Sequence, residues 1–433
     1  MRFDNLADWL AWQETLHPAR IELKLERVGQ VWARMAPALG LEGDPFRLSC
    51  PVITVGGTNG KGSCVAYLDA WYRAAGYRSC AYTSPHLLRY NERMRIDGQE
   101  VGDAALCQAF GRVDAARGDT LLTYFEFGTL AALDLFLRAD PDVVLLEVGL
   151  GGRLDAVNII EPDVAVVMSI GLDHTRWLGD TLNAIAFEKA GIFRAGRPAV
   201  IGQRDAPARL RGRAQEIGAT VLQLGREFDA RIDAGQWAWI GPAGAERAAL
   251  PPPALRGRFQ YDNAAAALTA AHCLSDRLPL SVAALRQGLH RVQLTGRFTV
   301  RPGRPTWVLD VAHNAPAAAG LAANLSALPC GGRRHAVFSL LEDKDAVAVS
   351  AALAPLVDHW HLAPAPAARA KPVADLCAAV VAASPQAQPR RYPDLDAAIA
   401  GAASVAAADD CILVFGSFTT VEAALRNPLV ASV

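Results

Sequence analysis

A glycine-rich run after a short apolar segment holds the residues best suited to chemistry in this sequence. Residues 52–55 are apolar or β-branched, and GTNGKGS follows at residues 57–63. Glycines let backbone N–H groups approach phosphate oxygens, and the start of a helix adds a favourable dipole. Lys61 would add positive charge, and Ser63 a hydroxyl for phosphate or magnesium. The run departs from the G-x-x-x-x-G-K-[ST] pattern. A tight turn with a solvated lysine is therefore the simpler alternative, but the combination favours a nucleotide site.

Polar residues follow three further predicted strands. Ser84, Glu147 and His174 each come directly or a few residues after an apolar run. Ligands of open parallel sheets bind beyond the carboxyl ends of the strands, so these groups are expected to meet near the phosphate loop. Hydroxyl, carboxylate and imidazole together suit one or two divalent cations on a nucleotide. Each residue alone has a simpler explanation: a residue before a proline turn, a helix cap or a loop histidine.

Two segments between these strand ends have the composition of a pocket for a planar molecule. GLGGRLDAVN at residues 149–158 combines a flexible backbone with the hydrogen-bonding side chains of Asp155 and Asn158. TYFEF at residues 123–127 places aromatic rings beside a carboxylate, which suits a planar heterocycle. The alternative for the aromatic segment is a helix face packed in the core.

The second half of the chain repeats the pattern of polar residues at strand ends. Asp310, His313 and Asn314 follow the apolar run 306–309. Ser417 follows another apolar run in the same way, and Arg297 lies in LTGRF beside a predicted hinge. Two α/β domains with such groups suit a closing transferase or ligase.

Short apolar runs alternate with amphipathic stretches, which predicts an α/β fold with parallel sheets. The mixture of Gly, Pro and Arg at residues 294–306 indicates a boundary between domains at 1–295 and 298–433. Residues 226–258 are interpreted as a β excursion or surface loop of the first domain. A helix is predicted over 63–75, ending at Gly76. The predicted strands are 52–55, 79–83, 143–146, 164–170, 199–201, 306–309, 335–340, 359–362 and 411–415.

Composition excludes several classes of protein. The chain has 433 residues, with 43 Lys and Arg against 44 Asp and Glu. This balance argues against a general nucleic-acid binder or a membrane-surface binder. The 8 cysteines are scattered without a CxxC pair, so neither a disulfide framework nor a zinc site is indicated. The first residues lack a signal-peptide pattern, and no apolar run reaches a membrane span. We expect a cytoplasmic protein.

With these residues in view, the sequence resembles the bifunctional folylpolyglutamate synthase/dihydrofolate synthase family of the Mur ligase superfamily. GTNGKG[ST] alone is shared with the Mur cell-wall ligases, whereas YTSPHL (82–87), the GGRLDA part of residues 146–158 and LDHT (172–175) indicate the folate branch. The likeness extends from about residue 16 to about residue 421. It continues through YNERMRIDG (90–98), FEKAGIFR (187–194), QYDNAAAAL (260–268), LTGRF (294–298), DVAHNAPAA (310–318), LEDKD (341–345) and FGSFTTV (415–421).

The resemblance implies an N-terminal P-loop-like ATPase domain with a parallel sheet, followed by a smaller C-terminal Rossmann-like α/β domain. The implied roles are an ATP- and pterin-binding first domain and a glutamate-ligase second domain. The implied reaction is ATP-dependent amide formation. ATP phosphorylates a pteroate or folate carboxylate to an acyl phosphate, and the amine of L-glutamate displaces phosphate. The implied products are dihydrofolate from 7,8-dihydropteroate and longer polyglutamate chains on tetrahydrofolate.

The resemblance also implies roles for single residues. Carbamylation is implied for Lys189, which would turn a cation into an anion beside Mg²⁺. ATP would contact Thr58, Asn59, Gly60, Lys61, Gly62, Ser63, Asn263, Arg297 and Asp310. Two magnesium ions would be held by Ser84, Glu147, His174 and Lys189. The residues implied in catalysis are Lys61, His174, Lys189, Asp310 and His313, while His313 and Ser417 match positions associated with phosphate or glutamate handling.

Bifunctional members also have a dihydropteroate pocket. In this sequence it maps to Arg20, Ile21, Glu22, Thr123, Tyr124, Phe125, Glu126, Leu154, Asp155 and Ala156. A folylpolyglutamate synthase without dihydropteroate activity is the alternative. Small-molecule substrates are the expected partners, with no nucleic acid or membrane, and a monomer is expected.

Two other interpretations remain, one a related enzyme and the other a protein of a different class. A Mur-type ligase acting on a UDP-linked peptide needs a separate N-terminal domain, and only about 50 residues precede the phosphate loop. A nucleotide-driven switch would hydrolyse ATP without joining a carboxylate to an amine. The second cluster of strand-end residues argues against that class.

Overall fold

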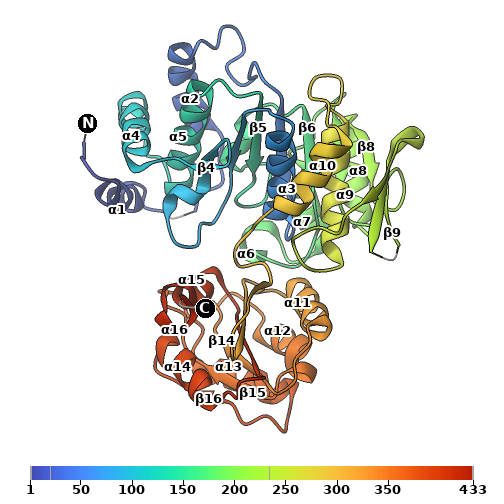
Figure 1. Cartoon of the computed structure of the whole chain (residues 1–433). Helices are drawn as coiled ribbons and strands as arrows, with labels where there is room; N and C mark the ends of the chain where they lie inside the picture. The colour runs from blue at the N-terminus through green and yellow to red at the C-terminus, as the bar shows by residue number, and fades with distance from the viewer. Residues whose placement is uncertain (1, 20, 234, 432–433) are drawn as a thin grey trace. The chain divides into compact units, whose positions relative to one another are not determined.

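The computed structural model describes residues 2–19, 21–233 and 235–431. The chain folds into two compact units (Figure 1). One comprises the chain up to Ala254 together with Tyr261–Val292, and the other comprises Leu255–Gln260 and the chain from Gln293 onward. Residues 255–260 thus belong with the second unit although they lie within the first predicted domain, 1–295. The assignment of separate chemical roles to the two domains stays a prediction.

The first unit is built on an eight-stranded sheet in the order β4-β3-β2-β5-β1-β6-β7-β8. Six neighbouring strands, from β2 to β8 in this order, run parallel, and β3 and β4 extend one edge antiparallel. Their carboxyl ends lie along one edge because Val55 is in register with Glu147 and Gly56 with Val167. The strands are β1 (Val52–Gly56), β2 (Ser79–Tyr82), β3 (Met94–Ile96), β4 (Gln99–Glu100), β5 (Val143–Glu147), β6 (Val164–Val167), β7 (Pro198–Ile201) and β8 (Thr220–Gln223).

Helices cover this sheet, and several begin at a side-chain cap. Asn5, Thr123, Thr181 and Ser281 each accept a hydrogen bond from a backbone N–H of the first turn, which satisfies an otherwise unpaired donor. The helices are α1 (Leu6–Leu16), α2 (Glu26–Met35), α3 (Lys61–Ala74), α4 (Asp103–Arg117), α5 (Tyr124–Arg138), α6 (Thr175–Leu178), α7 (Leu182–Ala190), α8 (Ala208–Ile217), α9 (Phe259–His272) and α10 (Val282–Arg291). Short 3₁₀ helices occupy Ala36–Leu39, Tyr90–Arg93, Ala156–Ile159 and Pro242–Gly244.

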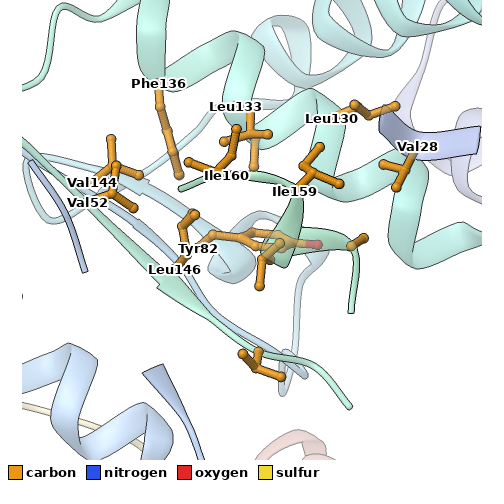
Figure 2. Close-up of a cluster of buried hydrophobic side chains, with 14 of the residues drawn as sticks. Val28, Val52, Tyr82, Leu130, Leu133, Phe136, Val144, Leu146, Ile159 and Ile160 are labelled. Carbon is orange, nitrogen blue, oxygen red and sulfur yellow. The ribbon is translucent and has the colours of Figure 1, made fainter. Parts of the chain in front are cut away.

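Two packing contacts fix the helices that lie beside the site strands. Helix α10 lies beside α3 (Figure 1), where the indole nitrogen of Trp71 donates to the carbonyl of Leu285 at 3.1 Å. On the other side, α5 packs on the sheet through an apolar layer of fully buried side chains (Figure 2). Figure 2 shows Phe136 of α5 beside Val52 and Val144 of the sheet, Leu133 beside Ile160, and Leu130 beside Val28. Burial of this size stabilises each side chain by about 1.5–3 kcal/mol.

The predicted β excursion is confirmed. The strands β9 (Asp229–Asp233), β10 (Gln236–Ile240) and β11 (Glu246–Leu250) form a separate antiparallel sheet in the order β11-β10-β9. Trp237 and Trp239 are buried, and the indole nitrogen of Trp239 donates to Thr269 Oγ1 of α9 at 2.9 Å. The two tryptophans therefore attach this sheet to the first unit.

The second unit has a six-stranded sheet in the order β12-β13-β17-β14-β15-β16, parallel except for β12. Asp310 and Phe338 are both in register with Phe415, so β13, β14 and β17 end together. The strands are β12 (Thr299–Arg301), β13 (Thr306–Asp310), β14 (Arg334–Phe338), β15 (His359–Leu362), β16 (Arg390–Arg391) and β17 (Cys411–Phe415). The helices are α11 (Ala315–Ala327), α12 (Ala346–Leu353), α13 (Val373–Ala383), α14 (Leu395–Val405), α15 (Phe418–Arg426) and α16 (Pro428–Ala431), with a 3₁₀ turn at Ala354–Leu356.

The α/β class with parallel sheets is confirmed, and all nine predicted strands are present within two or three residues. Helix α3 begins at Lys61 and not at Ser63, because Gly60 with φ of 89° ends the loop there. The predicted strand 164–170 stops at Val167, because the residues after it bond to the phosphate loop instead of continuing the sheet.

No helix within the described ranges is both long and apolar enough to cross a membrane.

Candidate active site

The phosphate loop (residues 57–63) joins β1 to α3 in a conformation that only glycine adopts without strain. Gly57 has φ of +142° and Gly60 has φ of +89°. A Cβ at Gly57 would lie 3.1 Å from the backbone nitrogen of Ser169, and one at Gly60 would lie 2.8 Å from Asn263 Oδ1. Glycine at these two positions therefore lets the loop pack closely against the segment after β6 and against Asn263. A glycine-rich loop that leads directly into a helix N-terminus suits the phosphates of a nucleotide.

The loop is fastened to the segment that follows β6. The backbone nitrogen of Thr58 donates to the carbonyl of Ser169 at 2.6 Å, and that of Asn59 donates to Ser169 Oγ at 3.0 Å. Thr58 Oγ1 accepts from the backbone nitrogen of Gly171 at 3.0 Å. Thr58 and Asn59 thus hold the loop in place, with Ser169 as partner. Ser169 was not predicted to have a role, although its position just after a strand is the signal that pointed to Ser84.

Two lysines converge on one carbonyl oxygen of the loop. Lys61 Nζ donates to Gly57 O at 3.0 Å, and Lys189 Nζ, from α7, donates to the same oxygen at 3.1 Å. Lys189 is 4% exposed. Burial, followed by the charge of Lys61, lowers the pKa of Lys189 to about 7. A substantial part of the Lys189 population is therefore the neutral amine at physiological pH.

Ser84 and Glu147 meet at the carboxyl ends of β2 and β5. The backbone nitrogen of Ser84 donates to Glu147 Oε2 at 3.2 Å, and Glu147 is 4% exposed. Glu147 is in register with Val55, two residues before the phosphate loop. A buried carboxylate next to a hydroxyl supplies hard oxygen ligands. These donors fit Mg²⁺, which completes its coordination with water and phosphate oxygens.

His174 lies in the segment after β6 and precedes α6. Its φ is 50°, its side chain is 43% exposed, and its Nε2 lies 3.9 Å from Asp173 Oδ1. Across the described ranges, no three His, Cys, Asp or Glu side chains are grouped closely enough to hold a metal ion. A magnesium site built from these residues would therefore need ligands of other kinds, such as a hydroxyl, water or oxygens of the nucleotide.

Asp155 uses its carboxylate to shape the second glycine-rich run. Its Oδ2 accepts from the backbone nitrogen of Leu150 at 2.8 Å and its Oδ1 from that of Val157 at 3.1 Å. Burial raises the pKa of Asp155 to about 6. Leu154 is half-buried and Ala156 is buried on either side of Asp155. Asn158 donates to the carbonyl of Arg153 at 3.0 Å, which closes the same turn.

Thr123 and Glu126 form the capping box of α5. Glu126 Oε2 accepts from the backbone nitrogen of Thr123 at 2.8 Å and from Thr123 Oγ1 at 2.9 Å. The backbone nitrogen of Glu126 donates back to Thr123 Oγ1 at 3.4 Å. Both residues are buried, 3% exposed each. This reciprocal arrangement fixes the first turn of α5 and hence the direction of the aromatic residues between them.

The two aromatic residues of that turn, Tyr124 and Phe125, pack against different parts of the first unit. The Phe125 ring is packed against Gly149, where an added Cβ would lie 2.6 Å from it, and its centroid is 5.8 Å from that of Tyr82. Tyr124 packs edge-to-face on Tyr90 at 5.6 Å. The structure thereby brings residues 123–126 beside the glycine-rich run that Asp155 organises.

The predicted N-terminal part of the pocket is joined to α5 by Arg27, a residue that we did not predict. Its Nε donates to both carboxylate oxygens of Glu126 at 2.9 and 2.8 Å, and its guanidinium also contacts the carboxylate of Glu22. Ile21 is 37% exposed. Arg20 lies outside the described residues.

In the second unit, the predicted polar residues gather at the ends of β13 and β17. Asp310 accepts from the backbone nitrogens of Phe298 and Ala312 at 2.7 Å each, and burial raises its pKa. The Arg297 guanidinium lies 5.1 Å from the ring centroid of Phe418, and the His313 ring lies 6.4 Å from it.

The remaining members of this cluster are caps. Ser417 caps α15 by accepting from the backbone nitrogen of Thr420 at 3.0 Å. Asn314 caps α11 in the same way. Asn263, from the first unit, lies beside Gly60 as described above.

The comparisons with known proteins agree with this geometry. The Mur ligase middle domain matches residues 55–271, and the Mur ligase glutamate ligase domain matches residues 296–418. The dihydrofolate synthase/folylpolyglutamate synthase of Escherichia coli is 42% identical over 96% of this chain and 94% of its own. The chain belongs to the dihydrofolate synthase/folylpolyglutamate synthase family.

Solved structures of the dihydrofolate synthase/folylpolyglutamate synthase family extend the likeness to the whole fold. E. coli FolC in complex with DHPP and ADP is 41% identical, with a TM-score of 0.91 over 99% of this chain and 98% of its own. A second member with Mn, AMPPNP and L-glutamate bound is 42% identical, with a TM-score of 0.88 over 98% and 97%. The predicted family, fold class and ATP-dependent ligase class are confirmed. The two alternatives from other classes find no support in these relatives.

Arg93 is another candidate functional residue that we did not predict from the sequence. Arg93 stacks over the rings of Tyr90 and Tyr124 at 5.3 and 5.7 Å, and its Nε donates to His86 Nδ1 at 2.8 Å. Burial lowers the pKa of His86 to about 4, so the imidazole is neutral and accepts this hydrogen bond. Arg93 belongs to YNERMRIDG, which carried the resemblance but no assigned role.

Proposed function

We propose that this chain joins L-glutamate to 7,8-dihydropteroate, forming dihydrofolate, and to tetrahydrofolate, extending its polyglutamate chain. The observation that carries the proposal is the phosphate loop, whose Gly57 carbonyl accepts from Lys61 and Lys189. The loop lies at the same edge of the sheet as Glu147, and the glycine-rich run after Glu147 packs against Phe125. Relatives support it, since E. coli FolC binds DHPP and ADP and another member binds AMPPNP, Mn and L-glutamate.

In the proposed reaction, a substrate carboxylate oxygen attacks the γ-phosphorus of ATP and ADP leaves. The glutamate amine then attacks the acyl carbon, an amide bond forms, and inorganic phosphate leaves. The phosphate loop, from Thr58 to Ser63, binds and orients the phosphates, and Lys61 offsets their negative charge. Positioning and charge neutralisation are the main contributions a protein makes to phosphoryl transfer.

Magnesium would be held by Ser84 and Glu147, with His174 and Lys189 serving a second ion. When bound, the metal would neutralise charge on the phosphates. Asn263, Arg297 and Asp310 are proposed to contact the nucleotide. His313 and Ser417 are proposed to handle phosphate or glutamate, and His313 or water to take the proton that the glutamate amine loses.

The position of Lys189 supports its proposed carbamylation. Two ammonium groups donating to Gly57 O repel each other, whereas a carbamate on Lys189 would convert this repulsion into attraction. The neutral amine adds to CO₂, and one proton is released as the carbamate forms. Native mass spectrometry is expected to show a fraction heavier by one CO₂, and ¹³C NMR with ¹³C-bicarbonate a carbamate signal. Absence of both would contradict the carbamylation.

The pocket for dihydropteroate is proposed to comprise Ile21, Glu22, residues 123–126 and residues 154–156. Its test is phosphate release with Mg²⁺, ATP and L-glutamate, with dihydropteroate or tetrahydrofolate added separately and products identified by mass. Turnover with both pterins is expected. Turnover with tetrahydrofolate alone would favour the folylpolyglutamate-only alternative, and release that ignores both would overturn the proposal.

The residues proposed here come from one chain, so the proposal requires no second copy. We propose a monomer that binds small molecules and neither nucleic acid nor membrane. Sedimentation analysis of the purified protein tests the monomeric state directly.

A further inference from the structure

Arg27 occupies an unusual position between two segments that are far apart in the chain. It lies in the first turn of α2 and is 16% exposed at its side chain. Its Nε donates to both oxygens of Glu126, 99 residues away, and the rest of its guanidinium contacts the carboxylate and the carbonyl oxygen of Glu22. One side chain therefore bonds to residues of two segments of the proposed dihydropteroate pocket.

At the Glu126 end of this bridge, the carboxylate is buried and already accepts several hydrogen bonds. The Glu126 side chain is 4% exposed. Its carboxylate accepts hydrogen bonds from the backbone nitrogen and the hydroxyl of Thr123 as well as from Arg27. A buried carboxylate with hydrogen bonds but no nearby cation is costly, so Arg27 supplies the charge that balances it. Because Glu126 is the third residue of α5 and forms the capping box with Thr123, the position of Arg27 also bears on the first turn of α5, where Phe125 lies.

The Glu22 end is more exposed and has further partners within its own segment. Lys24 Nζ lies 2.6 Å from Glu22 Oε1, and His17 Nε2 lies 3.2 Å from Oε2. The hydrogen bond from Lys24, followed by that from Arg27, lowers the pKa of Glu22 to about 2, so it is ionised at any working pH. Lys24 and His17 come from the same N-terminal segment as Glu22. Arg27 is therefore the contact that ties the Glu22 carboxylate to α5.

We propose that Arg27 is a positioning residue for the dihydropteroate pocket, holding the segment at Glu22 against the first turn of α5 so that both face the pterin together. This inference rests on the proposed function. It assigns Arg27 no contact with ATP or L-glutamate, because its described partners belong to the pterin-side segments. Loss of the bridge should therefore weaken the use of dihydropteroate selectively.

The test compares Arg27→Gln with wild type in steady-state kinetics for each substrate. We expect the KM for dihydropteroate to rise about tenfold, the size of one charge-assisted hydrogen-bond contribution. The KM values for ATP and L-glutamate are expected to stay within about twofold. Arg27→Lys keeps one positive charge but not the fork that reaches two carboxylates, so it should recover only part of the loss.

A second ion pair on α5, the helix of Glu126, supplies a control. Arg112 of α4 pairs with both carboxylate oxygens of Asp134, which is as buried as Glu126 but lies eight residues farther along α5 and is also bonded by Arg138 at 3.1 Å. Arg112→Gln should lower thermal stability without a selective change in the KM for dihydropteroate. It separates loss of a buried ion pair from loss of pocket geometry.

The outcomes are distinct. An unchanged KM for dihydropteroate in Arg27→Gln, or an equal rise in all three KM values, would overturn the role of Arg27 while leaving the proposed function intact. A wild-type enzyme that releases no phosphate with dihydropteroate and glutamate would overturn both. If Arg27→Gln does not fold, Arg27→Lys decides, because a full return to wild-type KM would exclude a role for the two-carboxylate bridge.

Discussion

Lys61 and Lys189 share the carbonyl oxygen of Gly57 as hydrogen-bond acceptor, at 3.0 and 3.1 Å. The two lysines come from the first turn of α3 and from the end of α7, 128 positions apart. Two cations so close to one neutral oxygen are stable together only if something offsets their repulsion. The lowered pKa of Lys189, caused by burial and by Lys61, is one response, and a bound polyphosphate would be another.

Lys61→Ala is expected to abolish phosphate release while leaving the protein folded. Lys61 begins α3, where alanine is a good helix former, so the loss falls on charge at the phosphates and not on the fold. We expect a fall in kcat of about 100-fold or more. Turnover close to wild type, with an unchanged circular dichroism spectrum and melting temperature, would contradict the assignment of Lys61 to ATP.

Lys189→Ala is expected to lose activity that small carboxylic acids partly restore. The variant leaves a space beside Gly57 O that acetate or propionate can enter, returning the negative charge that a carbamate would carry. Phosphate release is measured with and without the added acid, and Lys61→Ala serves as the control that should not recover. Equal recovery in both variants would show a nonspecific salt effect.

Gly60→Ala tests the phosphate loop itself. The substitution meets two penalties, a φ of +89° and a Cβ 2.8 Å from Asn263 Oδ1, so the loop must move. We expect a large rise in KM for ATP and a loss of about 1–2 kcal/mol in the free energy of unfolding.

Gly76→Ala is the matched control for this prediction. Gly76 has a similar φ of +87° but nothing within 4 Å of an added Cβ. It should show the conformational penalty on stability without the change in KM for ATP. Equal kinetic effects in the two variants would contradict a specific role for the loop geometry.

A buried hydrogen-bonded chain in the second unit predicts sensitivity to acid. Tyr392 Oη lies 3.0 Å from His361 Nδ1, His361 Nε2 lies 3.3 Å from His335 Nδ1, and His335 Nε2 lies 3.1 Å from Asp410 Oδ2. Burial first, then the neighbouring His335, Arg390 and His359, lowers the pKa of His361 to about 4.

The sign of this dependence follows from proton uptake. An unfolded histidine binds its proton near pH 6.5 while the folded His361 does not, so stability falls as the pH drops from about 6.5 to about 4. The whole effect is at most about 3 kcal/mol. His361→Gln should flatten the decline of melting temperature over this range, whatever its stability at pH 7. An unchanged slope would show that another group governs the acid transition.

The order of residues along the chain by itself determined the α/β class, the phosphate loop and the polar strand ends. These features depend on short-range rules: glycines before a helix, apolar runs of strand length, and polar residues where such runs stop. The motifs that identified the family are equally local. Even so, local rules placed the start of α3 at Ser63, whereas the helix begins at Lys61, directly after Gly60 in the left-handed conformation.

Only the tertiary structure decided which of those residues are partners. Lys189 reaches Gly57 across 132 residues and Arg27 reaches Glu126 across 99, and no local spacing indicates either pair. Asp155, Thr123 and Glu126 were selected as residues facing a ligand, yet their side chains also hold backbone turns in place. The reason is physical: hydrogen-bond partners are set by sheet register and helix packing, which bring distant segments within 3 Å of each other only after the chain has folded.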